Sequence, residues 1–393
     1  MLSMHKKAIH VCFFSILAGS AVFFGLGSGA GCGSRGKVVR IAVALPLTGD
    51  LGSEGQGLSR AVTLAVDEAN EAHSLPFKVE VAAFDDRADP AEAYNVANLI
   101  MADPRIAAVI GHYSSDCSAR AARVYARGPL AMITPASTNP EITGQQLRPD
   151  WPGARVAFRL VPTDEVQADF AAQFVRHRLR KERMAVAHDG TLYGRGLAER
   201  FQMTFRRLGG RIVKETAVAV GSRRLGTALR SLLAGNPEGL FYGGRYPEAG
   251  LLLKEMRRLG VRLLFCSGDG VRTPGLFDVA GPAADGAYLT MAGVPVESLP
   301  AARPFIAAYR ARWTGASEGL RPFDYFGYEA ARIVLEALAV AGPDRSRLLE
   351  TVRRSRHAGL LGVTVFDEKG DVQDHNVAMS RARAADRSFP VVR

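Results

Sequence analysis

The sequence predicts an α/β protein of two lobes, in which each lobe is a parallel β-sheet flanked by helices. Short apolar runs alternate with amphipathic stretches from residue 38 onward, which is typical of strands joined by helices. The alternation repeats after an extended stretch that contains proline, Phe158-Arg-Leu-Val-Pro162. The roughly 360 residues beyond the first segment are also too many for one comfortable core. Two similar series joined by an extended stretch indicate two lobes and a hinge.

The first series predicts a sheet that helices cover on both faces. Its expected elements, in chain order, are a strand over Val38–Leu45, a helix over Ser53–His73, a strand over Phe77–Phe84, a helix over Pro90–Met101, a strand from Ile106, a helix over Ser118–Arg127 and a strand from Leu130. This βαβα order calls for a parallel sheet, because parallel neighbours are joined by crossover helices.

Two of these strands run directly into small hydroxyl residues, in the segments Ile106–Ser115 and Leu130–Thr138. In open α/β sheets the binding crevice lies outside the carboxyl ends of the strands, where helix N-termini attract anions. Hydroxyls and amides at two adjacent strand ends suit a carboxylate, although ordinary helix capping by Ser and Thr explains the same pattern. The hydroxyl residues concerned are Ser114, Ser115, Ser137 and Thr138.

The second series repeats the alternation. It predicts a helix capped by Thr163 and Asp164, a strand over Met184–His188, a helix over Tyr193–Leu208, a strand over Arg211–Val218, a helix over Arg223–Leu233, a strand over Gly239–Tyr242, a helix over Pro247–Leu259 and a strand over Leu263–Ser267. The end of the chain has helical patterns with few strands, which suggests a return crossing that completes both lobes. It predicts helices over Ala302–Trp313, Tyr325–Ala341 and Ser346–Arg354 and strands over Gly362–Phe366 and Val372–Met379.

Residues 1–31 are interpreted as a secretory signal segment, so the body of the protein is expected outside the cytoplasmic membrane. Lys6 and Lys7 precede an uncharged run from Ala8 to Leu26, and small residues follow before Cys32. This ending resembles a lipobox, in which Cys32 is lipidated and anchors the protein to the membrane. Cleavage after Ala30 and an uncleaved anchor are the alternatives.

Composition excludes several classes of function. The net charge of +11 comes mostly from arginines scattered over helix faces without an aromatic stacking platform, so no nucleic-acid partner is expected. Cys117 and Cys266 are too far apart to imply a disulfide framework, and both are expected as thiols. The Gly-rich segment 49–57 lacks dinucleotide-loop spacing and the histidines lack metal-ligand spacing, so no cofactor or metal is expected. His112, His177 and His188 are expected to be capped or on the surface.

Several ordered segments resemble the periplasmic leucine/isoleucine/valine-binding proteins, which are type I solute-binding proteins of amino-acid ABC transporters. The resemblance runs from about Val38 to about Ala378. The segments are Ile41-Ala-Val-Ala-Leu-Pro-Leu-Thr-Gly49, Asp85-Asp-Arg-Ala-Asp-Pro90, Val109-Ile-Gly-His112, Met132-Ile-Thr-Pro-Ala136, His188-Asp-Gly-Thr-Leu-Tyr-Gly194, Tyr242-Gly-Gly244 and Phe366-Asp-Glu-Lys-Gly-Asp371. Each segment is weak alone, and the specificity lies in their order over nearly the whole chain beyond the signal.

The resemblance implies two α/β lobes of the type I periplasmic binding protein fold, three crossings between them, and closure over one ligand in the cleft. It places residues 38–159 and 292–362 in the N-terminal lobe and residues 163–288 and 366–393 in the C-terminal lobe. It implies that the first lobe holds the amino acid's carboxylate and ammonium and that an acid of the second lobe pairs with the ammonium. The residues carried over are Tyr113, Ser114, Ser115, Ala136 and Thr138 of the first lobe, Tyr193 and Asp269 of the second, and Phe323 at the side-chain pocket.

The chemistry of the residues agrees with those roles. A free amino acid needs donors for its carboxylate, which Ser115 and Thr138 supply, and an acceptor for its ammonium, which Asp269 supplies. Closure would desolvate these charges and strengthen the pairing. Taken without the resemblance, Asp269 between two glycines is an ordinary turn residue.

Two departures concern the ligand's side chain. Glu54 stands where the branched-chain binders have an aromatic residue, and Arg245 stands where they have a tyrosine. Tyr246 restores that tyrosine if the loop slides by one residue; alternatively, Glu54 and Arg245 bridge the closed lobes or recognise a polar side chain. The family's disulfide has no counterpart, because Ala88 and Ser114 stand at the matching places.

The expected function is that of a monomeric receptor, not an enzyme, which captures an aliphatic or small polar amino acid and delivers it to an ABC permease. A ligand sensor of the amide- or urea-binding kind is the alternative on the same fold. An exported enzyme is disfavoured because no nucleophile elbow and no His-Glu-x-x-His motif occurs in a suitable context.

Overall fold

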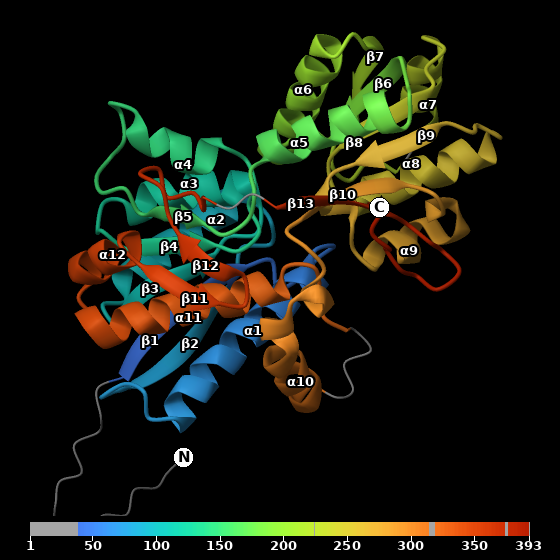
Figure 1. Ribbon diagram of the computed structural model, residues 1–393. Helices are drawn as coiled ribbons and strands as arrows, with labels where there is room; N and C mark the ends of the chain where they lie inside the picture. Colours follow the sequence, from blue (N-terminus) through green and yellow to red (C-terminus); the bar gives the residue numbers. More distant parts are fainter. Residues whose placement is uncertain (1–37, 224, 314–318, 374–375, 393) are drawn as a thin grey trace, which may run out of the picture. The chain divides into compact units, whose positions relative to one another are not determined.

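The computed structural model describes residues 38–223, 225–313, 319–373 and 376–392. The predicted signal segment over 1–31 and the predicted lipid site Cys32 lie outside these residues. The first sheet has five parallel strands in the order β2-β1-β3-β4-β5 (Figure 1). Its strands are β1 (Val38–Leu45), β2 (Lys78–Asp85), β3 (Ile106–Gly111), β4 (Ala131–Thr134) and β5 (Ala157–Arg159).

Helices from both ends of the chain cover this sheet. They are α1 (Gly52–Glu71), α2 (Pro90–Ala102), α3 (Ser115–Tyr125), α4 (Glu141–Gly144), α10 (Arg303–Arg312), α11 (Asp324–Ala341) and α12 (Arg345–Arg353). Helix α1 packs along α11, although they lie far apart in sequence (Figure 1). The approach depends on Gly57, because a Cβ there would lie 2.5 Å from the carboxylate of Asp324.

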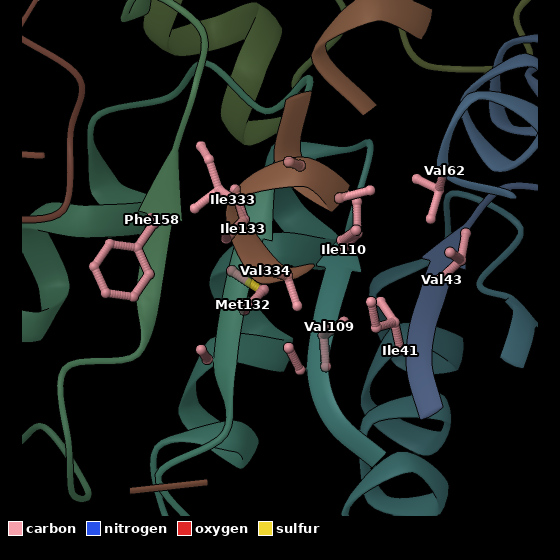
Figure 2. Close-up of a cluster of buried hydrophobic side chains, with 14 of the residues drawn as sticks. Ile41, Val43, Val62, Val109, Ile110, Met132, Ile133, Phe158, Ile333 and Val334 are labelled. Atoms are coloured by element: carbon pink, nitrogen blue, oxygen red, sulfur yellow. The ribbon is translucent and has the colours of Figure 1, made fainter. Parts of the chain in front are cut away.

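The core of the first lobe lies between this sheet and its helices. The strands are apolar runs because a parallel sheet covered on both faces buries both sides of each strand, and every residue of β3 is buried. Side chains of the central strands meet those of α1 and α11 there (Figure 2). Those labelled are Ile41, Val43, Val62, Val109, Ile110, Met132, Ile133, Phe158, Ile333 and Val334.

The second sheet has six strands in the order β13-β10-β9-β8-β6-β7. Its strands are β6 (Arg183–His188), β7 (Arg211–Ala217), β8 (Gly239–Gly243), β9 (Leu264–Ser267), β10 (Tyr288–Ala292) and β13 (Val377–Arg381). Its helices are α5 (Asp164–Gln173), α6 (Leu192–Arg207), α7 (Gly226–Leu233), α8 (Tyr246–Arg258) and α9 (Gly275–Ala280). The predicted two-lobe α/β fold is confirmed, with the refinement that the edge strand β13 runs antiparallel to β10.

The end of the chain departs from the sequence prediction at two places. A hairpin of β11 (Arg356–Gly359) and β12 (Gly362–Val365) follows α12; β12 corresponds to the strand predicted over Gly362–Phe366, whereas no strand was predicted at β11. The N–H groups of Leu360 and Leu361, at the hairpin turn, donate to the buried carboxylate of Glu329 in α11. The last strand begins at Val377, five residues after the predicted start at Val372.

The chain crosses between the two sheets three times: between β5 and α5, between β10 and α10, and between β12 and β13. Phe366 and Val372 pack in the core of the first lobe. The lobe boundaries given above stay a prediction, and this packing supports a third crossing placed after Val372. Among the residues that the structure describes, none of the helices is both long and apolar enough to cross a membrane.

Candidate functional site

The carboxyl end of β3 forms one side of the candidate site. Strand β3 ends at Gly111, and α3 begins at Ser115, three residues earlier than predicted, with Ser114 in the extended conformation of an N-cap. The first N–H groups of a helix have no partner within it. Ser115 therefore brings both a hydroxyl and a helix N-terminus to this edge of the sheet. Its hydroxyl oxygen accepts a hydrogen bond from the N–H of Asn139, at 3.3 Å.

The end of β4 lies beside it, and hydroxyl groups tie the two strand ends together. The main-chain oxygen of His112 has three hydroxyl oxygens within hydrogen-bonding distance: Thr134 at 2.8 Å, Ser137 at 3.0 Å and Ser118 at 3.2 Å. The Ser137 hydroxyl also lies 2.9 Å from the main-chain oxygen of Tyr113. Ser137, predicted to contact a ligand, is thus occupied in joining the two strand ends.

The imidazole of His112 is fully buried, so its expected capped or surface position was wrong. Its Nδ1 lies 2.6 Å from a carboxylate oxygen of Asp86, and its Nε2 lies 3.1 Å from the hydroxyl oxygen of Tyr125. A buried polar group is costly unless it is hydrogen-bonded, and both ring nitrogens have partners here. The residue before Tyr113 and Ser114 is therefore fixed by contacts from the loop after β2 and from α3.

Asp269 lies at the end of β9 in the second lobe, at the start of a short 3-10 turn over Asp269–Val271. One of its carboxylate oxygens accepts from the hydroxyl of Tyr193 at 2.8 Å, and the other from the amide of Gln167 at 2.9 Å. Gln167 in turn accepts from Thr290 at 2.8 Å. Burial raises the pKa of Asp269, while the Tyr193 and Gln167 hydrogen bonds oppose that rise.

Asp164 is a second buried acid at this place, which sequence reasoning identified only as a helix cap. It is 1% exposed. Its carboxylate oxygens have no hydrogen bond of standard geometry among the described residues, although the Thr138 hydroxyl is close enough to oppose the rise of its pKa. Burial and then the negative charge of Asp269 raise its pKa well above the ordinary range. Nothing in the sequence indicated that Asp164 would be buried beside Asp269, because an acid in the first turn of a helix is common for electrostatic reasons alone.

The predicted residues of the two lobes meet around one narrow cavity. The cavity is lined by Tyr113, Ser115, Ala136, Thr138, Tyr193, Arg245, Asp269, Gly270 and Phe323. Tyr113 and Phe323 stack edge to face, with ring centroids 5.7 Å apart. The described lining does not include four predicted residues: Ser114, Ser137, Glu54 and Tyr246.

Glu54 and Tyr246 instead connect the two lobes beside the cavity. The Thr273 hydroxyl donates to Glu54 at 2.5 Å, and a guanidinium nitrogen of Arg321 lies 3.7 Å from the same carboxylate oxygen. The Tyr246 hydroxyl donates to the main-chain oxygen of Asp50. No described ion pair joins Glu54 to Arg245. Of the alternatives that the sequence left open for these residues, Glu54 thus bridges the lobes, while Arg245 lines the cavity.

The two described cysteines are buried thiols, as predicted. Burial raises the pKa of both, to about 12 for Cys266 and further for Cys117. Both are therefore protonated at neutral pH.

A family model of periplasmic binding proteins matches residues 38–387 of the chain. The Leu/Ile/Val-binding protein homolog 1 of Brucella melitensis is 30% identical over 346 residues, which cover 86% of this chain and 89% of the relative. A leucine-, isoleucine-, valine-, threonine- and alanine-binding protein of Pseudomonas aeruginosa is 28% identical over 338 residues, which cover 86% of this chain and 87% of the relative.

Solved structures resemble this chain over nearly its whole length. A leucine binding protein of Thermotoga maritima superimposes with a TM-score of 0.81 at 27% identity, covering 90% of this chain and 98% of the other. A branched-chain amino acid transporter substrate binding protein of Streptococcus pneumoniae, in complex with isoleucine, has the same TM-score of 0.81 at 22% identity, covering 91% of this chain and 99% of the other. At that identity the second likeness concerns the fold alone.

Proposed function

The chain belongs to the periplasmic binding proteins and within them to the Leu/Ile/Val-binding proteins, and on that premise we propose that it captures a free amino acid between its lobes for an ABC transporter. The observation that carries the proposal is one small cavity whose wall combines Ser115 and Thr138 of the first lobe with Asp269 of the second. Hydroxyl and N–H donors on one side and a carboxylate on the other are complementary to a zwitterion. The proposed ligand is an amino acid with a short side chain, aliphatic or small and polar.

Each part of the zwitterion has a proposed partner. The ligand's carboxylate accepts hydrogen bonds from Ser115 and Thr138 and from the N–H groups at the start of α3. Its ammonium donates to Asp269, with Tyr193 holding that carboxylate in place. Because donors and acid belong to different lobes, a ligand that carries both charges stabilises the closed form more than the open one. Binding energy is thereby coupled to closure.

The role needs binding and release without chemistry, so we propose that the protein is not an enzyme. Its proposed partners are the amino acid and the permease subunits of the transporter, and it is proposed to act as a monomer. We propose a place outside the cytoplasmic membrane, either free in the periplasm or held on the extracytoplasmic side through a lipid on Cys32.

A ligand screen with an acid variant tests this function. Wild-type protein is expected to be stabilised by at least one free amino acid, by about 2.7 kcal/mol at a hundred times its Kd. Asp269→Asn keeps the shape of the side chain but removes the charge that faces the ammonium. Loss of one partner of a buried charge pair costs about 3 kcal/mol, so amino-acid affinity should fall by more than about a hundredfold in calorimetric titration.

The control is Asp278→Asn, which changes a carboxylate that is 64% exposed and pairs with Arg387 at the surface. It should leave affinity unchanged, and circular dichroism should show both variants folded. Equal affinity of Asp269→Asn and wild type would remove the ammonium role. Stabilisation by urea or amides but by none of the amino acids would sink the proposed function and favour a sensor.

A further inference from the structure

One group in the cavity wall is not used by the zwitterion's two charges. Arg245 is the N-cap residue of α8, directly after β8 and Gly244, and its side chain lines the cavity. It is only partly exposed. Its main-chain oxygen accepts from the N–H of Ala249, but within the described part of the chain its guanidinium forms no hydrogen bond and no ion pair. A partly buried guanidinium with five donors therefore faces the ligand space without a protein acceptor.

The acid that sequence reasoning offered as a partner is engaged elsewhere. Glu54 accepts from Thr273 at 2.5 Å and from Ser53 at 2.8 Å, and it has the Arg321 guanidinium beside it. Asp189, at the end of β6, attracts Arg245 electrostatically but forms no described ion pair with it. One oxygen of Asp189 accepts from both the N–H and the hydroxyl of Thr191, at 2.9 and 2.6 Å.

Tyr246, the aromatic residue that could have lined this part of the wall, does not line it. Tyr246 packs in the core of the second lobe against Gly275, where an added Cβ would lie 2.6 Å from the tyrosine ring. Its hydroxyl donates a hydrogen bond to the main-chain oxygen of Asp50. A one-residue slide of the loop has therefore not restored a tyrosine to the cavity, and Arg245 stands in its place.

We propose that the ligand is an amino acid whose short side chain ends in a carbonyl or carboxylate oxygen, and that Arg245 donates to that oxygen. The inference rests on the proposed function and narrows its ligand class. The planar guanidinium fork matches such oxygens in one or two parallel N–H···O bonds. An aliphatic side chain would instead press methyl groups against a charge that has lost part of its water and gained no acceptor. Aspartate, asparagine, glutamate and glutamine carry the required oxygen.

The test is a calorimetric panel of those four amino acids against leucine, isoleucine, valine, alanine and threonine, with wild type and Arg245→Met. Wild type is expected to bind one of the first four at least tenfold more tightly than any of the others. Arg245→Met keeps an unbranched stem without the charge, and it should weaken that ligand by about ten- to a hundredfold, the range for charge-assisted hydrogen bonds. Arg245→Lys keeps the charge but not the fork, and its loss should be smaller.

Arg257→Met is the matched control, because it makes the same substitution on an exposed turn of the same helix, α8. It should leave the whole panel unchanged. A preference for leucine, isoleucine, valine, alanine or threonine in wild type overturns this inference but leaves the proposed function standing. Equal effects of Arg245→Met on all ligands overturn it as well. If no amino acid binds wild type, the proposed function and this inference fall together.

Discussion

Asp269 lines the cavity, and it differs from the neighbouring buried acid Asp164 in how it is hydrogen-bonded. Asp269 receives donors on both oxygens, whereas the oxygens of Asp164 have no hydrogen bond of standard geometry among the described residues. Burial raises the pKa of both, and the charge of Asp269 raises that of Asp164 further. Two close carboxyl groups in a dry site do not both ionise readily. We infer that the protonated form is favoured more strongly at Asp164 than at Asp269.

Amino-acid affinity is expected to fall in mild acid. The ammonium needs the ionised form of Asp269, and the pKa of that carboxyl is raised above its ordinary 3.8. Affinity should therefore be full above the raised pKa and should weaken as pH falls through it, with proton release on binding in that range. Calorimetric titrations between pH 8 and pH 4 in buffers of different ionisation enthalpy would measure both effects. A flat profile over the whole acid range in which the protein stays folded would contradict the assignment.

Asp164→Asn is expected to behave differently from the Asp269 variant. An amide resembles a protonated carboxyl in shape and charge, so Asp164→Asn should retain amino-acid affinity at neutral pH within about threefold, which is below about 0.7 kcal/mol. The measurement is the same titration at pH 7. A hundredfold loss in Asp164→Asn would mean that Asp164 is ionised and takes part in holding the ammonium.

At the scale of elements, a network centred on His112 connects the loop after β2 with the ends of β3 and β4. Asp86 and Tyr125 hold its ring, and Thr134, Ser137 and Ser118 surround its main-chain oxygen. Tyr113 and Ser115, which line the cavity, follow within three residues. The network therefore fixes the segment that is proposed to bind the carboxylate common to all amino acids.

His112→Ala is expected to cost stability and affinity together. It removes the imidazole that bonds one oxygen of the buried Asp86 carboxylate, while the N–H of Ala88 still bonds the other oxygen. One buried acceptor is then unsatisfied, which costs about 1 to 3 kcal/mol of the free energy of unfolding. Urea denaturation measures that loss, with His177→Ala, an exposed histidine, as control. Affinities for different amino acids should fall by one common factor, because the network lies behind the shared carboxylate site. A change in preference among ligands would contradict this placement.

Local patterns predicted most elements, and the misplaced ones depend on distant contacts. The apolar runs of β1, β3 and β4 were visible because both faces of each strand are buried. The start of α3 was placed three residues late, since a run of Ser residues offers several caps. The β11–β12 hairpin was invisible as a pair, because its turn is held by Glu329, about thirty residues earlier in the chain.

At the scale of the whole molecule, direct hydrogen bonds join the lobes beside the cavity. Glu54 accepts from Thr273, and Tyr246 donates to Asp50. In addition, Asp116 and Asn139 of the first lobe both bond the main chain of Leu192, at 3.0 and 2.8 Å. These bonds favour the closed form independently of the ligand. The stronger they are, the less of the ligand's binding energy is needed to close the lobes.

The double variant Thr273→Val with Tyr246→Phe is expected to open the protein. Each substitution removes one hydrogen bond between the lobes, worth about 1 kcal/mol net, so the closed-to-open ratio should fall by about thirtyfold. Small-angle X-ray scattering should give a larger radius of gyration for the ligand-free variant than for wild type, and saturating ligand should remove the difference. Thr351→Val, whose hydroxyl bonds its own helix, serves as control. Equal radii without ligand would contradict the role.

The parts of the candidate site that could be predicted are those whose side-chain chemistry and motif were visible in the sequence. Ser115, Ala136, Thr138, Tyr193 and Asp269 gather as the family resemblance implied, although their contact with a ligand stays a prediction. A place for Arg245 in the cavity wall was among the alternatives that the sequence left open, but Asp164 and Gln167 were beyond sequence reasoning. Their places depend on how two separately folded sheets meet, and local periodicity carries no information about that packing.

The buried guanidinium of Arg159 limits how the two lobes can move. It pairs with Asp371 at 2.5 Å and donates to the main-chain oxygen of Asn139 and the hydroxyl of Thr143, so the first and third crossings leave the first lobe from one fixed point. Because these two crossings are fixed to each other, neither can shift along the other. The lobes can then move mainly by rotating about the few residues that follow the anchor. Each cycle of opening should therefore return Asp269 to the same position opposite Ser115, which makes capture reproducible without any guide beyond the chain itself.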